Sequence, residues 1–187
     1  KQEDISTTIE SAPAAVVESL QTPTTTPPVA TTTVKTPDKT PTPVPVSNLS
    51  IVKRLLPDGN SEPRTTPITH VLVHFISNVS AKPENPHNIN DIISIFLGTG
   101  LSSHYLIGRD GTVYQLTPEN RVAYHGGKGE LIKFPAYTNK INNYSIGIEI
   151  AAIGTKSEMT EFISADKYDA LPKSDIGYTS AQYASLS

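Results

Sequence analysis

Residues 103–116 read Ser-His-Tyr-Leu-Ile-Gly-Arg-Asp-Gly-Thr-Val-Tyr-Gln-Leu, and this stretch decides what kind of sheet the chain builds. Its two halves, 103–109 and 112–116, favour β-strands. Between them lies the dipeptide Asp110-Gly111, which suits a type I′ turn. Because so short a loop joins antiparallel strands, the stretch predicts a β-hairpin.

Three other segments favour strands. Residues 51–56 predict a short edge strand, and residues 144–153 predict a longer one. Residues 68–75 are rich in β-formers and apolar on both faces, which is typical of a buried strand. The chain therefore has enough strands for a central sheet around the hairpin.

Two segments favour helices. Residues 88–97 predict a helix with Asn90 as its N-cap, which Gly98 and Gly100 stop. The apolar face of this helix consists of Ile92, Ile93, Phe96 and Leu97. Residues 179–182 fit a capping box, and Tyr183 and Leu186 would begin the apolar face that follows. Strands alternating with helices, one strand pair being antiparallel, predict an α/β fold with a mixed central β-sheet flanked by helices.

Composition divides the chain into two parts. No aromatic Phe, Tyr or Trp precedes Phe75, and Thr and Pro fill most of residues 22–46. Such a segment cannot bury enough apolar surface to offset its ordering entropy. We therefore expect residues 1–47 to be a disordered Thr/Pro-rich tail or spacer, and residues 48–187 to be the folded domain. Whether the segment holds the domain away from another module or has no role stays open.

Charge and residue content exclude several classes of function. The net charge of −3 gives no electrostatic footprint for nucleic acid or for an anionic membrane. No apolar run approaches the roughly 18 residues of a transmembrane segment. With 0 cysteines, the chain has neither disulfides nor thiolate chemistry.

Two histidines on one strand suggest a metal site. In an extended segment 68–75, His70, Leu72 and His74 share one face. Four residues of strand span about 13 Å, whereas zinc ligands lie about 2 Å from the ion, so at most one of the two histidines binds a given metal. The alternative for either histidine is a packed or hydrogen-bonded residue of the sheet.

Glu149 lies in an apolar strand. Its neighbours Ile146, Ile148 and Ile150 share the core face, while Glu149 shares the other face with Ser145, Gly147 and Ala151. Small flanking residues predict open space around the carboxylate, and partial burial would raise its pKa toward the range used in general acid–base catalysis. The alternative is a carboxylate on a solvated face or one paired with a cation.

A third candidate is His125, between Tyr124 and the glycine pair Gly126-Gly127. Glycines let a ligand or another segment approach the backbone closely. The alternative is a flexible loop in which His125 merely caps a neighbouring group. His87, which follows Pro86, is expected to be an exposed loop residue, and nothing local gives His104 a role.

Four motifs follow one another between Thr69 and Ser187. They are the strand ending Val73-His74, the stretch 102–116, Ala123-Tyr124-His125-Gly126-Gly127, and the run from Asn142 to Ile150; Thr179 to Tyr183 then opens a helix. In this order they resemble the N-acetylmuramoyl-L-alanine amidase family, the amidase-2 group that includes phage endolysins, autolysins and peptidoglycan recognition proteins. The third motif has Tyr where the family has Trp, and Gly where it has Ala.

The resemblance implies roles for these residues. His74 takes the position of the first zinc ligand and Glu149 that of the catalytic carboxylate, while His125, with Tyr124 and Gly126, lies where the family lines its substrate groove. The implied activity is zinc-dependent hydrolysis of the amide bond between N-acetylmuramic acid and L-alanine in peptidoglycan. The cofactor is Zn²⁺, and the partner is peptidoglycan, through its glycan strand and stem peptide.

The resemblance also implies that the zinc site is incomplete. In the family, a second histidine and a final Asp or Cys follow the helix that Thr179 opens, and no histidine follows Glu149 here. We therefore expect the chain to be truncated before these ligands and inactive by itself, although the complete protein is an amidase. The alternative is a non-catalytic peptidoglycan-binding module of the same fold, and a spacer-bearing interaction protein that has lost its site is a third hypothesis. The expected protein is secreted, wall-associated and monomeric.

Overall fold

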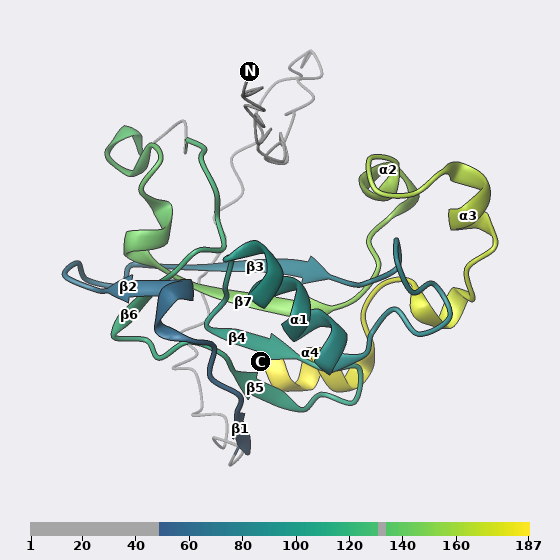
Figure 1. Cartoon of the computed structure of the whole chain (residues 1–187), viewed down its shortest axis with the longest axis horizontal. Helices are drawn as coiled ribbons and strands as arrows, with labels where there is room; N and C mark the ends of the chain where they lie inside the picture. Colours follow the sequence, from purple (N-terminus) through teal and green to yellow (C-terminus); the bar gives the residue numbers. More distant parts are fainter. Residues whose placement is uncertain (1–48, 131–133) are drawn as a thin grey trace, which may run out of the picture. The chain divides into compact units, whose positions relative to one another are not determined.

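A computed structural model describes residues 49–130 and 134–187 (Figure 1). The predicted spacer, residues 1–47, lies outside these ranges. The described residues contain a five-stranded sheet in the order β1-β5-β4-β7-β3 and a two-stranded sheet, β2-β6. The strands are β1 (Ile51–Lys53), β2 (Ser61–Pro63), β3 (His70–Ile76), β4 (Tyr105–Ile107), β5 (Val113–Gln115), β6 (Arg121–Ala123) and β7 (Ser145–Ala151).

The five-stranded sheet is mixed, as predicted. Strands β4 and β5 pair antiparallel, whereas the pairs β1–β5, β4–β7 and β3–β7 are parallel. The helices are α1 (Ile89–Thr99), α2 (Lys156–Met159), α3 (Ala165–Asp169) and α4 (Ser180–Leu186). Single 3₁₀ turns are η1 (Asp58–Asn60), η2 (Pro135–Tyr137), η3 (Ile141–Tyr144) and η4 (Lys173–Asp175). The predicted fold class, α/β with a mixed central sheet flanked by helices, is confirmed.

The hairpin forms, but its turn is not type I′. A type I′ turn needs a positive φ at both central residues, whereas of Asp110 and Gly111 only Gly111 has one, at 84°. The N–H of Gly111 donates to Gly108 O at 2.9 Å, and that of Gly108 donates to Thr112 O at 2.9 Å. A longer loop with one left-handed glycine therefore joins β4 to β5, and the Asp110 side chain stabilises it by accepting from the Thr112 N–H at 3.0 Å.

Strand β3 lies at an edge of the sheet, which corrects the prediction of a strand buried on both faces. It pairs only with β7 among the described strands. Val71 and Val73, which share one face of β3, are 60% and 46% exposed, so this face is not covered. The face that carries His70, Leu72 and His74 is partly covered instead. Apolar residues on both faces therefore did not distinguish an edge strand from a central one.

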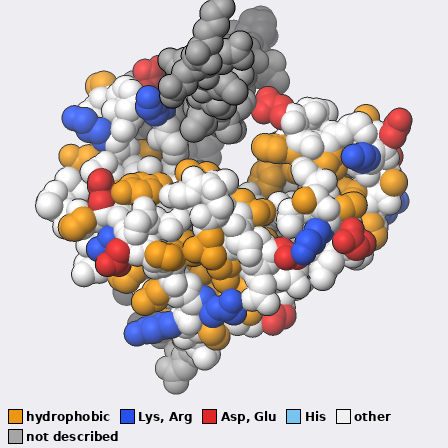
Figure 2. All heavy atoms as spheres, in the orientation of Figure 1, with side chains coloured by type: hydrophobic (Ala, Val, Ile, Leu, Met, Phe, Trp, Pro, Cys, Tyr) orange, Lys and Arg blue, Asp and Glu red, His pale blue; other side chains and the backbone are white. Residues whose placement is uncertain are grey.

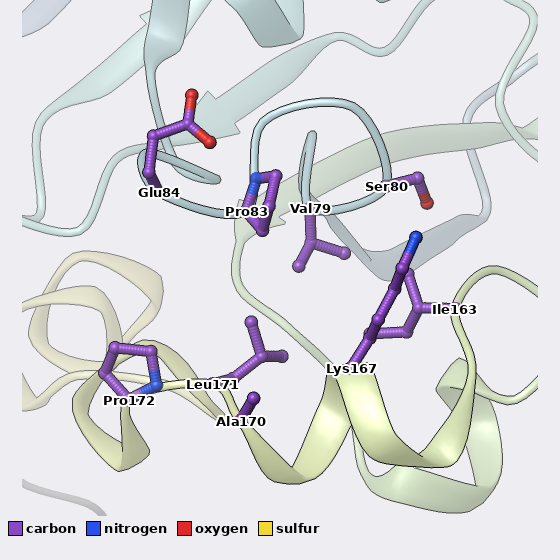
Figure 3. A pocket seen from close by; sticks show the side chains of 9 residues that line it. All are labelled: Val79, Ser80, Pro83, Glu84, Ile163, Lys167, Ala170, Leu171 and Pro172. Atoms are coloured by element: carbon purple, nitrogen blue, oxygen red, sulfur yellow. The ribbon is translucent and has the colours of Figure 1, made fainter.

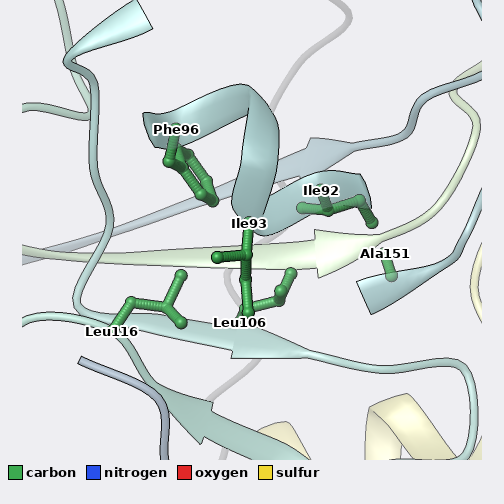
Figure 4. Packing of buried hydrophobic residues seen from close by; sticks show 6 residues of the cluster. All are labelled: Ile92, Ile93, Phe96, Leu106, Leu116 and Ala151. Atoms are coloured by element: carbon green, nitrogen blue, oxygen red, sulfur yellow. The ribbon is translucent and has the colours of Figure 1, made fainter. Parts of the chain in front are cut away.

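Helix α1 begins two residues earlier than its predicted N-cap implies, and it covers one face of the sheet. Asn88, not Asn90, is the N-cap, since its side chain accepts from the N–H groups of Asn90 and Asp91. Gly98 stays within the helix, and Gly100 at φ 73° ends it. The buried cluster shown in Figure 4 consists of Ile92, Ile93, Phe96, Leu106, Leu116 and Ala151. Leu97 is 51% exposed and does not belong to the apolar face.

Helix α4 starts with the predicted capping box. The Thr179 hydroxyl accepts from the Gln182 N–H at 3.1 Å, and the Gln182 side chain accepts from the Thr179 N–H at 2.9 Å. Tyr183 and Leu186 do not form a buried face, being 60% and 39% exposed. Gln182 is buried instead, and its amide donates to Ala151 O at 2.9 Å. No helix in the described ranges is long and apolar enough to span a bilayer.

Candidate active site

His74 and Glu149 lie side by side on one face of the sheet. They are direct partners in the parallel β3–β7 register, so neighbouring strands bring together two residues that are far apart in sequence. The Glu149 side chain is 8% exposed, and its Oε2 has no hydrogen-bond partner among the described residues. Burial raises the pKa of Glu149 to about 8 and lowers the pKa of His74.

His125 completes a cluster with these two residues. Its Nδ1 lies 3.5 Å from Nε2 of His74, and the two ring centroids are 5.7 Å apart. The imidazole packs directly on Gly147, where a Cβ would lie 2.4 Å from Cγ of His125. The space that we expected to be open beside Glu149 is therefore filled by the His125 ring, and the carboxylate is more deeply buried than predicted.

Ser145 holds the far side of the His125 ring. Its Oγ lies 3.1 Å from Nε2 of His125 and donates to Ile141 O at 2.7 Å. Burial, followed by the charges of His74, His104 and Arg64, lowers the pKa of His125 to about 3. The ring is thus neutral at physiological pH and serves as a fixed hydrogen-bonding group.

His104 is a buried neighbour to which sequence reasoning gave no role. Its Nδ1 accepts from the Gly147 N–H at 3.0 Å, and its Nε2 lies 3.1 Å from Arg121 O. The side chain is fully buried, and its ring centroid lies 5.8 Å from that of His125. Because it bonds the backbone of Gly147, His104 fixes the strand on which His125 rests. Its place inside the hairpin motif was the available signal.

Arg64 is a second residue that sequence reasoning missed. Its guanidinium donates to the carbonyls of Arg121 at 3.0 Å and Ser145 at 2.9 Å, and its Nε donates to Glu119 O at 2.9 Å. Burial lowers the pKa of Arg64. These bonds tie β6 to the start of β7, the strand that carries Ser145, Gly147 and Glu149. No local pattern around Arg64 indicates such a role, since its carbonyl acceptors and Nε2 of His104, 3.1 Å from the guanidinium, are all far away in sequence.

Gly126, the first glycine after His125, allows another segment of the chain to approach closely. The Gly126 N–H donates to Asn142 Oδ1 at 2.7 Å, and a Cβ at Gly126 would lie 2.8 Å from Cγ2 of Ile141. Of the two possibilities left open by the sequence, the close approach of another segment is the one observed at Gly126. Tyr124 is half-buried, and its backbone bonds Ser102. The substrate-binding roles of Tyr124, Gly126 and His125 stay predictions.

His87 is not the exposed loop residue that we expected. It is half-buried, and its Nε2 lies 3.0 Å from Asp175 O. Desolvation, with the charge of Arg109 next, lowers the pKa of His87. His70 is also separate from the cluster, since its ring packs on Tyr137 with centroids 4.7 Å apart. Neither histidine contributes to the His74 site.

A cavity of about 350 Å³ lies apart from this cluster (Figure 3). Mostly apolar side chains of the loop after β3 and of the α3 region line it, with Glu84 and Lys167 among them. Because none of its lining residues belongs to the His74 cluster, we do not place the chemistry there. Figure 2 shows that Lys, Arg, Asp and Glu are interspersed on the viewed face, without a field of one sign.

The described residues fit a zinc site only in part. They contain no group of three or more His, Cys, Asp or Glu side chains that could hold a metal ion. A catalytic zinc takes three protein ligands and a water. His74 is one suitable donor. Glu149, its partner in the β3–β7 register, has an Oε2 without a hydrogen-bond partner among the described residues, so this oxygen could bind a polar ligand.

Comparison with known proteins gives a family match. The sequence profile described as N-acetylmuramoyl-L-alanine amidase matches residues 64–187. No curated protein matches the chain.

Three solved structures are similar to the chain. AmpD, as a selenomethionine derivative, is 24% identical with a TM-score of 0.43, over 72% of this chain and 69% of that one. The Ph2119 endolysin from the Thermus scotoductus MAT2119 bacteriophage Ph2119 is 21% identical with a TM-score of 0.33, over 55% and 61%. PGRP-Hd from Alvinella pompejana is 15% identical with a TM-score of 0.41, over 73% and 93%.

Proposed function

This chain belongs to the N-acetylmuramoyl-L-alanine amidase family, and from that premise we propose that it hydrolyses the amide bond between N-acetylmuramic acid and L-alanine in peptidoglycan. The observation that carries the proposal is the pairing of Glu149 with His74. A carboxylate that is 8% exposed, with an oxygen that lacks a partner among the described residues, is costly to stability and needs a reason. A role in catalysis supplies that reason.

Glu149 would move the proton during hydrolysis. With a pKa of about 8, its carboxyl group gains and loses a proton near neutral pH, the condition for efficient general acid–base catalysis. It would take a proton from the attacking water and return it to the nitrogen of L-alanine as the amide bond breaks. The β3–β7 register holds the carboxylate beside His74 throughout.

We further propose that His74 is a ligand of a catalytic Zn²⁺. When bound, such an ion lowers the pKa of its water and polarises the scissile carbonyl. The other protein ligands must come from residues other than those that the structure describes. Without those further ligands, we expect the chain to bind zinc weakly and to be inactive. A protein of this activity would act outside the cell, at the wall.

His125, Tyr124 and Gly126 would line the substrate groove in this proposal. Of the three, His125 has the strongest support for this role, since its Nδ1 lies 3.5 Å from Nε2 of His74. The N–H of Gly126 is already bonded to the Asn142 side chain. Tyr124 is half-buried next to both. The partner is peptidoglycan, bound through the glycan strand and stem peptide, by a monomer.

A second candidate function is peptidoglycan binding without catalysis. The lack of a three-ligand group among the described residues favours it. Under this hypothesis, the buried carboxylate of Glu149 has no chemical use. The two candidate functions therefore predict different effects of removing the Glu149 charge: loss of hydrolysis for the enzyme, and no loss of binding for the binding module.

The test is hydrolysis of purified peptidoglycan by the full gene product with added zinc. Variants Glu149→Gln and His74→Ala are compared with Glu161→Gln, which removes an exposed carboxylate elsewhere. We expect the first two to lose at least about a hundredfold in rate, as for loss of an acid–base catalyst, and Glu161→Gln to keep the parent rate. If the parent protein binds peptidoglycan but releases no new amino groups, the binding module is correct.

A further inference from the structure

The hydroxyl group of Ser145 has one proton to donate, and two possible acceptors, Ile141 O and Nε2 of His125, lie within hydrogen-bond distance. The residue is fully buried on β7 and shares a face with Gly147 and Glu149. Its Oγ lies 2.7 Å from Ile141 O, which can only accept a hydrogen bond. The hydroxyl proton is therefore committed to that carbonyl.

This commitment determines the tautomer of His125. Nε2 of His125 lies 3.1 Å from the same Ser145 Oγ, which has only lone pairs left to offer. A hydrogen bond at this position requires a proton on Nε2. In a neutral imidazole with its proton on Nε2, the other nitrogen, Nδ1, carries no proton and can only accept a hydrogen bond.

Packing of neighbouring residues prevents the His125 ring from rotating away from Ser145. One of its sides rests on Gly147, where a Cβ would lie 2.4 Å from Cγ of His125. The His104 ring packs nearby at an interplanar angle of 72°. His104 in turn holds the Gly147 N–H through its Nδ1 at 3.0 Å. Ser145, Gly147 and His104 thus form a frame around His125.

The unprotonated nitrogen, Nδ1, faces His74, the proposed zinc ligand. Nδ1 of His125 lies 3.5 Å from Nε2 of His74, on the face of the sheet that carries Glu149. We propose that Ser145 is a positioning residue that fixes His125 as the Nε2–H tautomer, so that Nδ1 accepts a hydrogen bond from a substrate N–H. The substrate role rests on the proposed function, in which the donor is the amide N–H of the L-alanine that joins the stem peptide to the sugar.

The fixed tautomer would help to discriminate substrates. An acceptor at Nδ1 favours an amide N–H, whereas the opposite tautomer would place N–H against N–H. A site whose buried polar group is left unpaired by the wrong ligand disfavours that ligand. An ester in place of the scissile amide, which has no N–H to donate, should therefore bind less well.

The tautomer can be measured without substrate, by long-range ¹H–¹⁵N correlation spectra of the histidine rings in the metal-free chain. We expect Nε2 of His125 to resonate as a protonated nitrogen and Nδ1 as an unprotonated one at pH 7. Ser145→Ala should give a mixture of tautomers, and Ser145→Thr, which keeps the hydroxyl, should restore the parent spectrum. Ser103→Ala is the matched control, since Ser103 is equally buried but its Oγ has no partner.

Two results would overturn the role of Ser145. One is a parent protein in which His125 carries its proton on Nδ1, a measurement that does not depend on any variant folding. The other is a Ser145→Ala spectrum that equals the parent's.

Binding of muramyl dipeptide to the full gene product with added zinc, followed by isothermal titration calorimetry, tests the substrate part. We expect Ser145→Ala to weaken binding by up to about tenfold, the effect of one lost hydrogen bond, and Ser103→Ala to leave it unchanged. If the tautomer is as stated but the parent binds no muramyl dipeptide, the proposed function fails and the positioning by Ser145 stands. If the dipeptide binds equally well to parent and Ser145→Ala, the acceptor role of Nδ1 is wrong.

Discussion

Replacing Glu149 by Gln should change how stability depends on pH. Burial raises the pKa of Glu149 from 4.5 to about 8, and each pKa unit corresponds to about 1.4 kcal/mol. The ionised carboxylate therefore destabilises the folded state by about 5 kcal/mol at most. A buried amide without partners costs about 1–3 kcal/mol, so the net gain from Glu149→Gln above pH 8 is about 2–4 kcal/mol.

The direction in which stability changes with pH follows from whether the folded or the unfolded chain binds the Glu149 proton more tightly. Below about pH 4.5 the carboxyl is protonated in both folded and unfolded chains, and the substitution should not stabilise the protein. Between 4.5 and 8 the unfolded chain releases its proton first, so the parent loses stability as the pH rises. Above pH 8 both states are ionised and the loss is complete. His125, whose pKa is lowered to about 3, destabilises both proteins alike at acid pH and cancels in their difference.

The assay is urea denaturation of the metal-free chain in EDTA at pH 5, 6, 7 and 8.5. The difference in the free energy of unfolding between Glu149→Gln and parent should grow with pH across this window. Glu161→Gln, an exposed carboxylate, should show a difference close to zero throughout. A difference for Glu149→Gln that stays constant from pH 5 to 8.5 would refute the reasoning, because Glu149 would then not titrate with a raised pKa.

Three further predictions concern the frame around His125. Gly147→Ala should displace the ring and destabilise the fold by about 1–3 kcal/mol in urea denaturation, whereas Gly129→Ala, with nothing within 4 Å, should have little effect; equal effects would contradict the packing. His104→Ala should lower the free energy of unfolding by about 2–4 kcal/mol, because it opens a cavity and leaves the Gly147 N–H without its acceptor; a loss below about 0.5 kcal/mol in the same assay would show that the bond is unimportant. Arg64→Lys should cost about 1–3 kcal/mol, since an ammonium cannot replace the guanidinium fork that holds the Arg121 and Ser145 carbonyls, and an unchanged denaturation midpoint would argue against that tie.

The hydrophobic periodicity predicted where strands and helices lie better than it predicted what packs against them. The alternation along residues 144–153 placed Ser145, Gly147 and Glu149 on one face, and the structure has them there. The same reasoning could not tell that β3 lies at an edge, because exposure of Val71 and Val73 depends on strand order. Helix caps were predicted where both partners are local, as at Thr179 and Gln182. The N-cap of α1 was misplaced by two residues, because Asn88 and Asn90 are both suitable capping residues.

The candidate site was predicted in pieces, since nothing in the sequence joins them. His74 and Glu149 are partners only through the β3–β7 register, and His125 reaches them from a loop that rests on Gly147. The resemblance to a family named these three residues, but it did not indicate their contacts. Arg64 and His104 were missed because they bond backbone groups, which are the same in every sequence. Such residues become visible only when distant segments are brought together.

The most direct test of the account is to identify the bond that is cut. A muramyl peptide is incubated with the full gene product and zinc in ¹⁸O-labelled water, and the products are analysed by mass spectrometry. The account predicts one ¹⁸O in the lactyl carboxylate of muramic acid and a stem peptide with a free L-alanine amine, formed by the parent and by Glu161→Gln but not by Glu149→Gln. Label in any other product, or the same products from Glu149→Gln at the parent rate, would contradict it.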